Sequence, residues 1–383
     1  MNDVIVVGGG PVGSYVAKRL AGMGYGVEVL EKGTKNNKKV CCTGIIGKKC
    51  YQTFFADKDI ILKNGRSAVV YSPSGNVLHL KREEDQAYII DRSDLDSKMA
   101  SDAIAAGAEY IENCLVRKIA IHKNCAEVEY VKDGKILKPC TKTVVMATGF
   151  GSRLLSEIGV GKSGYYTVGA QIEVKHRDID EIEIYAGHNV APGHFGWLVP
   201  LDSKRALVGL MTRKTPGLYL KNFLSFLKDK GKIDVNGESP SYRGITLQPP
   251  KRTYGERFVV VGDAAGQVKP LTGGGLYFGL IGAEIAVNNI DKALTENDFR
   301  ADMLANYEKE WKSILGRDIN ICRLTHRLYT RLSDRQMDKI FNITTNKGID
   351  KGLLESGELD FDFHSKIIRK AIGFQTISKI FSR

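Results

Sequence analysis

Three glycine-rich segments, far apart in the chain, contain the residue types that bind phosphate and ribose. Residues 8–13 (GGGPVG) directly follow a β-branched run at residues 3–7 and fit the pattern G-x-G-x-x-G. Glycines in this pattern permit a sharp turn and let the backbone approach a pyrophosphate at a helix N-terminus, where unpaired N–H groups favour anions. Glu31 ends the next expected strand, 18 residues after Gly13. A carboxylate there accepts hydrogen bonds from ribose hydroxyls and disfavours a 2′-phosphate, so these residues predict a site for FAD or NAD.

The other two segments indicate that the dinucleotide is FAD. Residues 259–266 (VVVGDAAG) follow another strand about 250 residues later, and an enzyme that binds only NAD has no use for them. Asp263 is placed to bind a hydroxyl of the ribityl arm, beside small residues that let the chain pass close by. Residues 270–275 (PLTGGG) open a helix. Its N-terminus would stabilise the negative charge that develops on the ring of a reduced flavin.

These segments need elements that position them, and the periodicity of the chain supplies candidates. A strand at 3–7, a helix at 12–23 and a strand at 26–31 make a βαβ unit. The further expected elements are strands at 77–80 and 88–90, a helix at 94–106, an antiparallel meander at 110–131 with a turn at 133–134, a buried strand at 143–147, a strand-rich stretch at 165–213, a strand at 258–261, a helix at 275–289, and a basic helical remainder from 297.

Composition limits the classes of partner and compartment. The net charge of +12 in 383 residues favours an anionic partner such as a lipid or a phosphorylated substrate. Nucleic acid is not expected, because no helix-turn-helix, zinc-finger or RNP motif is present. Seven cysteines, an odd number, and a phosphate loop within the first residues predict a protein of the reducing cytoplasm without a targeting segment. The histidines show no paired spacing, so no metal is predicted.

Taken together, these motifs resemble those of the geranylgeranyl reductase family, within the glutathione-reductase-type flavoproteins of the p-hydroxybenzoate hydroxylase fold. The resemblance covers residues 3–289, including the 91–93 turn (DRS) before a helix with Asp96 and the strand end at 147–149 (ATG). It implies an α/β fold: a discontinuous Rossmann-like FAD-binding domain, an antiparallel-sheet substrate domain and a helical C-terminal region. The predicted domains are 1–60 with 92–160 and 250–296 for FAD, 61–91 with 161–249 for substrate, and 297–383 for the C-terminal region.

The motifs and the resemblance together predict the residues that bind FAD. Arg92 is included because the resemblance puts it near the flavin or its pyrophosphate, although an exposed arginine at a helix start is an equal alternative. The predicted set is Gly8, Gly10, Pro11, Val12, Gly13, Glu31, Lys32, Cys42, Arg92, Ala147, Gly149, Gly262, Asp263, Ala264, Gly273, Gly274 and Gly275.

The substrate side is predicted from residues 192–200 (PGHFGWLVP), which resemble the family's aromatic signature Y-x-W-x-F-P. This chain departs from it, with Phe195 in place of tyrosine and valine at the phenylalanine position. Strand alternation puts Phe195, Trp197 and Val199 on one apolar face, which suits a hydrocarbon chain, while a buried strand of the sheet is the alternative, above all for Val199. His194, Phe195, Trp197 and Pro200 are the predicted substrate contacts. His194 would touch a lipid phosphate or be an ordinary surface histidine.

Cys41 and Cys42 lie in a Cys-Cys-Thr-Gly loop where related reductases carry a cysteine near the flavin. A thiol there could donate the proton that accompanies hydride addition, and a small packing residue is the alternative for each. The other five cysteines are expected to pack. Residues 365–383 hold five basic and no acidic residues with apolar positions at helical spacing. Such a helix can lie on the inner face of the cell membrane or pack on the protein itself.

The resulting prediction is an FAD-dependent reductase that saturates C=C bonds of geranylgeranyl chains in isoprenoid lipids, by hydride transfer from N5 of the reduced flavin. Because there is no second G-x-G-x-x-G domain, NAD(P)H that visits transiently or a ferredoxin-like protein would supply the electrons. Three alternatives stay open: a flavin-dependent hydroxylase or monooxygenase, a quinone-linked dehydrogenase, which would usually carry iron–sulfur cysteines, and a non-enzymatic prenyl-chain carrier.

Overall fold

The computed structural model of the chain describes residues 1–34, 40–55, 58–161, 164–235, 237–346, 360–366 and 368. The chain divides into two compact units, and each unit gathers three separate stretches. Unit 1 comprises Met1–Lys39, Ser93–Tyr166 and Ile245–Ile319; unit 2 comprises Val40–Arg92, Thr167–Gly244 and Asn320–Arg383. The three domains expected from the sequence stay a prediction.

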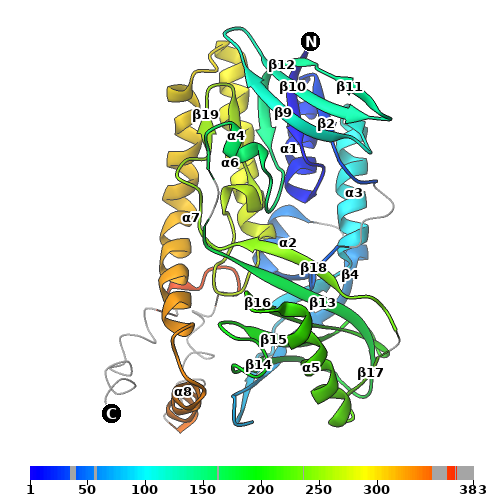
Figure 1. Ribbon diagram of the computed structural model, residues 1–383, viewed down its shortest axis with the longest axis vertical. Coiled ribbons are helices and arrows are strands. Elements are labelled where there is room, and N and C mark those ends of the chain that lie inside the picture. Colours follow the sequence, from blue (N-terminus) through cyan, green and yellow to red (C-terminus); the bar gives the residue numbers. More distant parts are fainter. Residues whose placement is uncertain are drawn as a thin grey trace. The chain divides into compact units, whose positions relative to one another are not determined.

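Unit 1 is built on a mixed sheet whose parallel strands run in the order β20-β12-β1-β2-β8. Figure 1 labels β2 and β12 of this sheet, together with β9, β10 and β11. Next to β12, the strands β10, β9 and β11 add an antiparallel extension. The bounds are β1 (Asn2–Val7), β2 (Val27–Leu30), β8 (Glu109–Ile111), β9 (Leu115–Ile121), β10 (Ala126–Lys132), β11 (Lys135–Leu137), β12 (Cys140–Met146), β19 (Tyr254–Gly255) and β20 (Phe258–Val260).

Except for β8, the parallel strands are largely buried and rich in β-branched residues, as expected for strands covered on both faces. The β1 residues Val4, Ile5 and Val6 are fully buried. The helical elements of unit 1 are α1 (Pro11–Gly22), α3 (Arg92–Ala105), whose first residue is assigned to unit 2, α4 (Leu154–Glu157), the 3₁₀ turn η2 (Gly262–Ala265) and α6 (Leu276–Glu296). The predicted βαβ unit is confirmed as β1-α1-β2.

The expected meander at 110–131 is correct for β9, β10 and β11 but wrong at its first residues. Tyr110 lies in β8, which pairs parallel to β2 through Val29↔Tyr110. The reason is topological: β8 follows the helix α3, and a strand reached by a helical crossover returns parallel to its neighbours.

Among its described residues, unit 2 contains an eight-stranded sheet in the order β17-β13-β16-β15-β14-β5-β6, with β18 beside β13. It also contains a three-stranded sheet in the order β3-β7-β4. The strands are β3 (Ile45–Gly47), β4 (Ile61–Gly65), β5 (Ser67–Tyr71), β6 (Val77–Lys81), β7 (Ala87–Ile90), β13 (Tyr166–His176), β14 (Ile182–Ala186), β15 (Phe195–Pro200), β16 (Arg205–Thr212), β17 (Ile233–Asp234) and β18 (Ser241–Thr246). Its helical elements are α2 (Lys48–Phe54), η1 (Lys58–Ile60), α5 (Pro216–Asp229) and α8 (Asp334–Asn346). The strand-rich stretch predicted at 165–213 is confirmed.

One face of the large sheet in unit 2 is closed by the amphipathic helix α5. Its residues Leu220, Phe223 and Leu227 are buried against sheet residues that include Ile172 and Leu210. The expected helical remainder is confirmed for residues 301–346 by α7 (Ala301–Tyr329) and α8, and most of its later part lies outside the described residues. None of the helices in the described ranges is long and apolar enough to cross a membrane.

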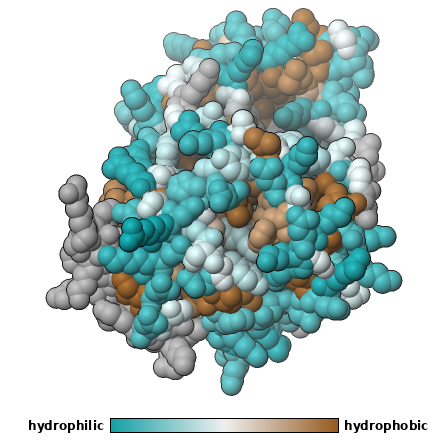
Figure 2. All heavy atoms as spheres, turned by 60° about the horizontal axis from the view of Figure 1, so that its bottom comes forward, coloured by the Kyte–Doolittle hydropathy of each residue, from teal (hydrophilic) through white to brown (hydrophobic). Residues whose placement is uncertain are grey.

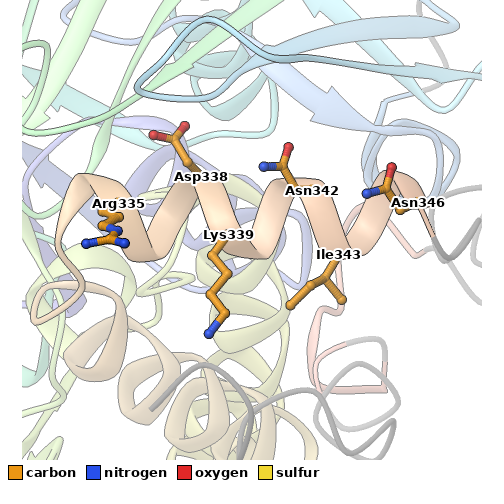
Figure 3. Close-up of a pocket in the computed structure, with 6 residues that line it drawn as sticks. All are labelled: Arg335, Asp338, Lys339, Asn342, Ile343 and Asn346. Atoms are coloured by element: carbon orange, nitrogen blue, oxygen red, sulfur yellow. The ribbon is translucent and has the colours of Figure 1, made fainter. Parts of the chain in front are cut away.

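A hollow of about 570 Å³ lies along α8. Figure 3 shows its six lining residues, which all come from this one helix: Arg335, Asp338, Lys339, Asn342, Ile343 and Asn346. One of these residues, Asp338, also accepts a hydrogen bond of 2.6 Å from Ser72 Oγ, which links α8 to the β5–β6 turn. No residue of the predicted flavin or substrate sites lines this hollow.

The surface of the molecule is mixed in character. On the face that Figure 2 shows, the coloured residues form separate hydrophobic patches within a mainly hydrophilic surface. The most exposed large apolar side chains include Leu218, with 56% of its surface exposed, and Leu324, with 62%. Single exposed residues of this kind are common in globular proteins and define no site by themselves.

Candidate functional site

The first glycine segment forms a tight turn between β1 and α1 in unit 1. Gly8 has φ +106°, and a Cβ there would lie 2.4 Å from the Ala147 carbonyl oxygen. A Cβ at Gly13 would lie 2.0 Å from the Gly8 carbonyl oxygen. Both positions therefore require glycine. Pro11 is the first residue of α1, where its missing N–H costs nothing.

Glu31 closes this turn from the end of β2. Its carboxylate accepts a hydrogen bond of 2.6 Å from the Gly9 N–H and one of 2.9 Å from the Gly33 N–H. The side chain is largely buried, while the neighbouring Lys32 is exposed. The predicted acidic residue thus lies directly at the glycine turn.

Tyr110 is a functional neighbour that the sequence did not reveal. Its hydroxyl lies 2.6 Å from Ser14 Oγ and donates to the Gly9 carbonyl at 3.2 Å. Its ring fills the space where a Cβ of Gly9 would lie. Burial raises the pKa of Tyr110 well above its usual range, so the hydroxyl is a neutral donor. β8 positions it by pairing with β2, which motif reading along the chain does not show.

Val12 joins the first segment to the second segment and to α6, the helix that follows the third segment. Its side-chain methyl carbons lie 3.3 Å from the Cβ position of Gly262, in the second segment, and 2.8 Å from that of Gly279, in α6. Larger residues at these two glycines would push α1 away. Segments about 250 residues apart in the chain are therefore brought together at the N-terminus of α1.

A buried polar network holds the second segment in place. The Gly262 N–H donates to Gln267 Oε1 at 2.7 Å, and Gln267 Nε2 donates to the Tyr307 hydroxyl at 2.8 Å. Tyr307 donates in turn to the Val260 carbonyl at 2.7 Å. Gln267 and Tyr307 are completely buried. Neither residue was predicted from the sequence. Gln267 could have been noticed as a glutamine among small and apolar residues.

The third segment packs against the second. A Cβ at Gly275 would lie 2.6 Å from Asp263 Oδ1, so the carboxylate lies close to the residue that precedes α6. Gly273 donates its N–H to the Lys269 carbonyl at 2.8 Å, and Lys269 donates its own N–H to Gly274 at 2.9 Å. The helix α6 begins at Leu276, directly after Gly275, and its N-cap residue makes no side-chain cap bond.

Two further observations fit a dinucleotide bound to unit 1. A Cβ built at Gly10 meets no atom within 4 Å, although its neighbours in the turn are tightly packed. Thr148 Oγ1, in the strand end next to Ala147, is buried and has no hydrogen-bond partner among the described residues. Gly149 follows with φ +67°. Ala264 is buried and belongs to the same core as Met146 and Val260.

The two adjacent cysteines lie in unit 2 with different surroundings. Cys42 Sγ accepts a hydrogen bond of 2.9 Å from Arg92 Nη1. Cys41 Sγ instead donates to the Ser241 carbonyl at 3.5 Å, and burial raises the pKa of this thiol. The Gln171 amide anchors the loop by donating to the Cys42 carbonyl at 3.3 Å. Arg92 is half-buried, so the exposed alternative considered for it is wrong.

The predicted substrate stretch forms β15, and the structure divides its residues between a half-buried and a fully buried set. Phe195 and Trp197 are half-buried, with ring centroids 6.1 Å apart. Trp197 packs over Gly209 of β16, where a Cβ would lie 2.5 Å from its ring. Val199 and Pro200 are buried, so the alternative that Val199 is an ordinary residue of a buried strand is correct. Trp197 Nε1 lacks a hydrogen-bond partner within the described part of the chain.

The expectation that His194 is a surface histidine is wrong. It is 3% exposed, and its Nε2 lies 3.0 Å from Nε2 of His326, on α7. Tyr329 donates to the His194 carbonyl at 2.8 Å. Burial, followed by the repulsion of His326, lowers the pKa of His194 to about 3, and burial lowers that of His326 to about 4. The sequence could not show this pair because its members are 132 residues apart.

Comparison with known proteins gives three results. The family model described as "Lycopene cyclase protein" matches residues 3–344. A digeranylgeranylglycerophospholipid reductase of Methanocaldococcus jannaschii is 30% identical over 363 residues, which are 88% of this chain and 89% of that protein. Digeranylgeranylglycerophospholipid reductase 1 of Methanococcoides burtonii is 29% identical and covers 88% of this chain and 86% of its own length.

Among solved structures, a geranylgeranyl bacteriochlorophyll reductase-like protein of Thermoplasma acidophilum superposes with a TM-score of 0.86 at 23% identity, and covers 99% of this chain and 98% of its own. The flavin-dependent brominase Bmp2 superposes with a TM-score of 0.69 at 18% identity, covering 98% and 99%. At these identities the structures show a shared fold. It is the α/β fold predicted from the sequence, with a Rossmann-type unit, sheets and C-terminal helices.

Proposed function

Because the chain belongs both to the lycopene cyclase protein family and to the family of the digeranylgeranylglycerophospholipid reductases, we propose that it is a flavin-dependent reductase that saturates C=C bonds in geranylgeranyl chains of isoprenoid lipids. The structural observation that carries the proposal is that Val12, of the first segment, packs on Gly262 of the second segment and on Gly279 of α6, the helix that the third segment opens. Such a convergence serves an extended cofactor better than it serves a single phosphate. A prenyl carrier without a cofactor would have no need of it.

The fold implies a flavin cofactor, and we assign it as FAD. Bound FAD would supply the hydride that the alkene accepts. Glu31 would hold the adenosine ribose, the first N–H groups of α1 the pyrophosphate, and Asp263 a ribityl hydroxyl. The burial of Glu31 against Gly9 N–H and the space beside Gly10 support this assignment. Release of the cofactor by heat, followed by chromatography, distinguishes FAD from FMN.

Cys42 rather than Cys41 is the proposed proton donor. The sulfur of Cys42 accepts from Arg92, so its own hydrogen remains available to another group. The hydrogen of Cys41 points to the Ser241 carbonyl instead. Arg92 has a positioning role in this scheme, because it fixes the direction of the Cys42 side chain. An unactivated alkene is a poor acceptor, so a placed acid and a dry pocket contribute directly to the rate.

The prenyl chain is proposed to bind along β15, at Phe195 and Trp197. Both rings are half-buried and apolar, and Trp197 belongs to a cluster that also contains Ile45 and Ile89 of β3 and β7. A role for Pro200 would be to hold this strand, since it is buried at the β15–β16 pair. His194 is too deeply buried to offer a charged group to a lipid phosphate.

The test is an anaerobic reoxidation assay with the holoenzyme. The protein is reduced with dithionite, a geranylgeranyl phospholipid is added, and flavin absorbance is followed while the lipid mass is measured. We expect the oxidised flavin spectrum to return as the lipid gains hydrogens in pairs. A flavin that stays reduced until oxygen is admitted would exclude the reductase and favour an oxygen-dependent reaction, such as that of a hydroxylase.

The electron donor and the location of the protein are further proposals. NAD(P)H or a ferredoxin-like protein would reduce the flavin, and stopped-flow reduction with each donor separates them. We also propose a cytoplasmic protein that touches the inner face of the membrane through residues 365–383. Apart from residues 365, 366 and 368, this segment lies outside the described residues. Flotation of the full chain and of a chain ending at residue 364 with anionic vesicles tests this contact.

A further inference from the structure

Two cysteines without a predicted chemical role meet at the amino end of β12, in the sheet of unit 1. Cys125 ends the turn between β9 and β10, and Cys140 is the first residue of β12. Their sulfur atoms lie 2.7 Å apart, about 0.7 Å more than the length of a disulfide bond. Both side chains are half-buried, so small reagents can reach them.

The strand register explains why the two sulfurs meet. β10 and β12 are antiparallel, with Glu127 directly opposite Cys140. Residues that are directly opposite point to the same face, and so does Cys125, which precedes Glu127 by two positions. Cys125 and Cys140 are therefore diagonal neighbours on one face, and their side chains turn toward each other so that the sulfurs meet.

An arginine holds this arrangement in place. The guanidinium of Arg257 donates to the Lys123 carbonyl at 2.7 Å and the His122 carbonyl at 3.2 Å, both in the β9–β10 turn. It also donates to the Lys142 carbonyl of β12 at 3.0 Å. The turn that carries Cys125 is thus tied to the strand that carries Cys140 before any covalent bond forms. Little backbone movement is needed to join the sulfurs.

We propose that Cys125 and Cys140 are a reversible thiol–disulfide pair, which a low-molecular-weight disulfide oxidises to a covalent link between the β9–β10 turn and β12. The pair lies at the amino end of β12. The glycine turn contacts the opposite end of this strand, at Ala147. The link therefore stabilises the sheet of unit 1 while leaving the proposed flavin-binding segments unchanged.

The exchange balances in two steps. The thiolate of one cysteine attacks the small disulfide, forms a mixed disulfide and releases the first small thiolate. The second cysteine then attacks the protein sulfur of the mixed disulfide and releases the second small thiolate. The two protons lost by the cysteines end on the two released thiols, so the protein is oxidised by two electrons and the small disulfide is reduced by two.

The test uses the purified holoenzyme with oxidised glutathione. Thiols are counted by alkylation after denaturation, and the disulfide is located by peptide mapping without reduction. We expect the count to fall from the seven cysteines of the chain to five, with one linked peptide pair that contains Cys125 and Cys140. The melting temperature should rise by about 5 °C, as expected for closing a loop of this length, and fall back with dithiothreitol.

Matched variants separate this pair from the other thiols. Cys125→Ser and Cys140→Ser should each lose the linked peptide and the thermal shift, whereas Cys322→Ser, at a buried cysteine elsewhere, should keep both. If glutathione adducts accumulate on Cys125 or Cys140 and no linked peptide forms, the proposal is overturned. The mapping of the unmodified protein decides the question even if a serine variant does not fold. The result is independent of lipid reduction.

Discussion

Replacing Gln267 with methionine tests how the turn at Gly262, part of the proposed flavin site, is held in place. Methionine has the length and flexibility of glutamine but cannot accept a hydrogen bond of comparable strength. The side chain is completely buried between the turn and α7, and lies against Gly282, where even a Cβ would come within 2.2 Å of it. The change therefore removes polar contacts and keeps most of the packing.

The expected loss follows from the partners that remain. The Gly262 N–H loses the 2.7 Å bond to Gln267 Oε1 and stays in a buried position. The Tyr307 hydroxyl loses one donor but still donates to the Val260 carbonyl. An orphaned buried donor costs about 1–3 kcal/mol, so the free energy of unfolding should fall by about that amount.

Urea titrations of the apoprotein measure this loss, and equilibrium binding measures the flavin dissociation constant. Tyr307→Phe is the matched control, because it removes the outer hydrogen bonds of the same network and leaves the Gly262–Gln267 bond intact. Both variants should unfold at lower urea concentrations. Only Gln267→Met should weaken flavin binding. The dissociation constant should rise by a factor between roughly 5 and 150 if the full cost of the orphaned donor is lost from the binding free energy.

Two results would refute this reasoning. If Gln267→Met unfolds at the urea concentration of the unmodified protein, the Gly262 N–H does not depend on Gln267. If Tyr307→Phe weakens flavin binding as much as Gln267→Met does, then α7 as a whole supports the site, and the bond to Gly262 has no special part.

The remaining predictions concern the proposed flavin, proton-donor and histidine residues. Glu31→Gln should weaken FAD binding by at least tenfold and FMN binding little, and equal losses for the two flavins would contradict the ribose role. Cys42→Ser should lower the rate of lipid-dependent flavin reoxidation by roughly 10²-fold while Cys41→Ser changes it little, and the reverse order would exclude our choice of donor. Arg92→Lys should lower the same rate without changing flavin content, because lysine cannot keep the guanidinium geometry. The folded-state pKa values of His194 and His326, about 3 and 4, lie below the usual 6.5 of histidine. The unfolded chain therefore binds more protons, so the stability from this pair is present above about pH 6.5 and lost as the pH falls towards 4. His326→Asn should flatten that dependence in urea midpoints measured from pH 4 to 8, and an unchanged slope would show that other groups cause it.

The local parts of the fold could be predicted from the sequence because their backbone geometry depends on residues that are neighbours in the chain. The turn at Gly8 needs a positive φ and a close approach of the Ala147 backbone, and the spacing of the glycines indicates that such a turn is present. The acidic residue at the end of β2 was found for the same reason, since a βαβ unit fixes where its second strand ends. Glu31 does contact the Gly9 N–H.

What the sequence missed are partners that only packing selects. Tyr110 reaches the glycine turn because β8 joins β2 in parallel, and Tyr307 reaches Gln267 because α7 crosses the turn at Gly262. His194 was expected at the surface because its neighbours in the chain do not indicate a contact with His326. Cys125 and Cys140 were expected to pack separately, and the register of β10 on β12 brings their sulfurs together.

The sequence by itself thus determined the family, the α/β class and the positions of the glycine segments, because each depends on backbone conformations set within a few residues. The tertiary structure alone decided which buried polar groups meet. A buried N–H, hydroxyl or imidazole must find a partner or lose stability, and that partner is chosen by how distant strands and helices pack. Gln267, Tyr307 and the His194–His326 pair are therefore visible only in the folded chain.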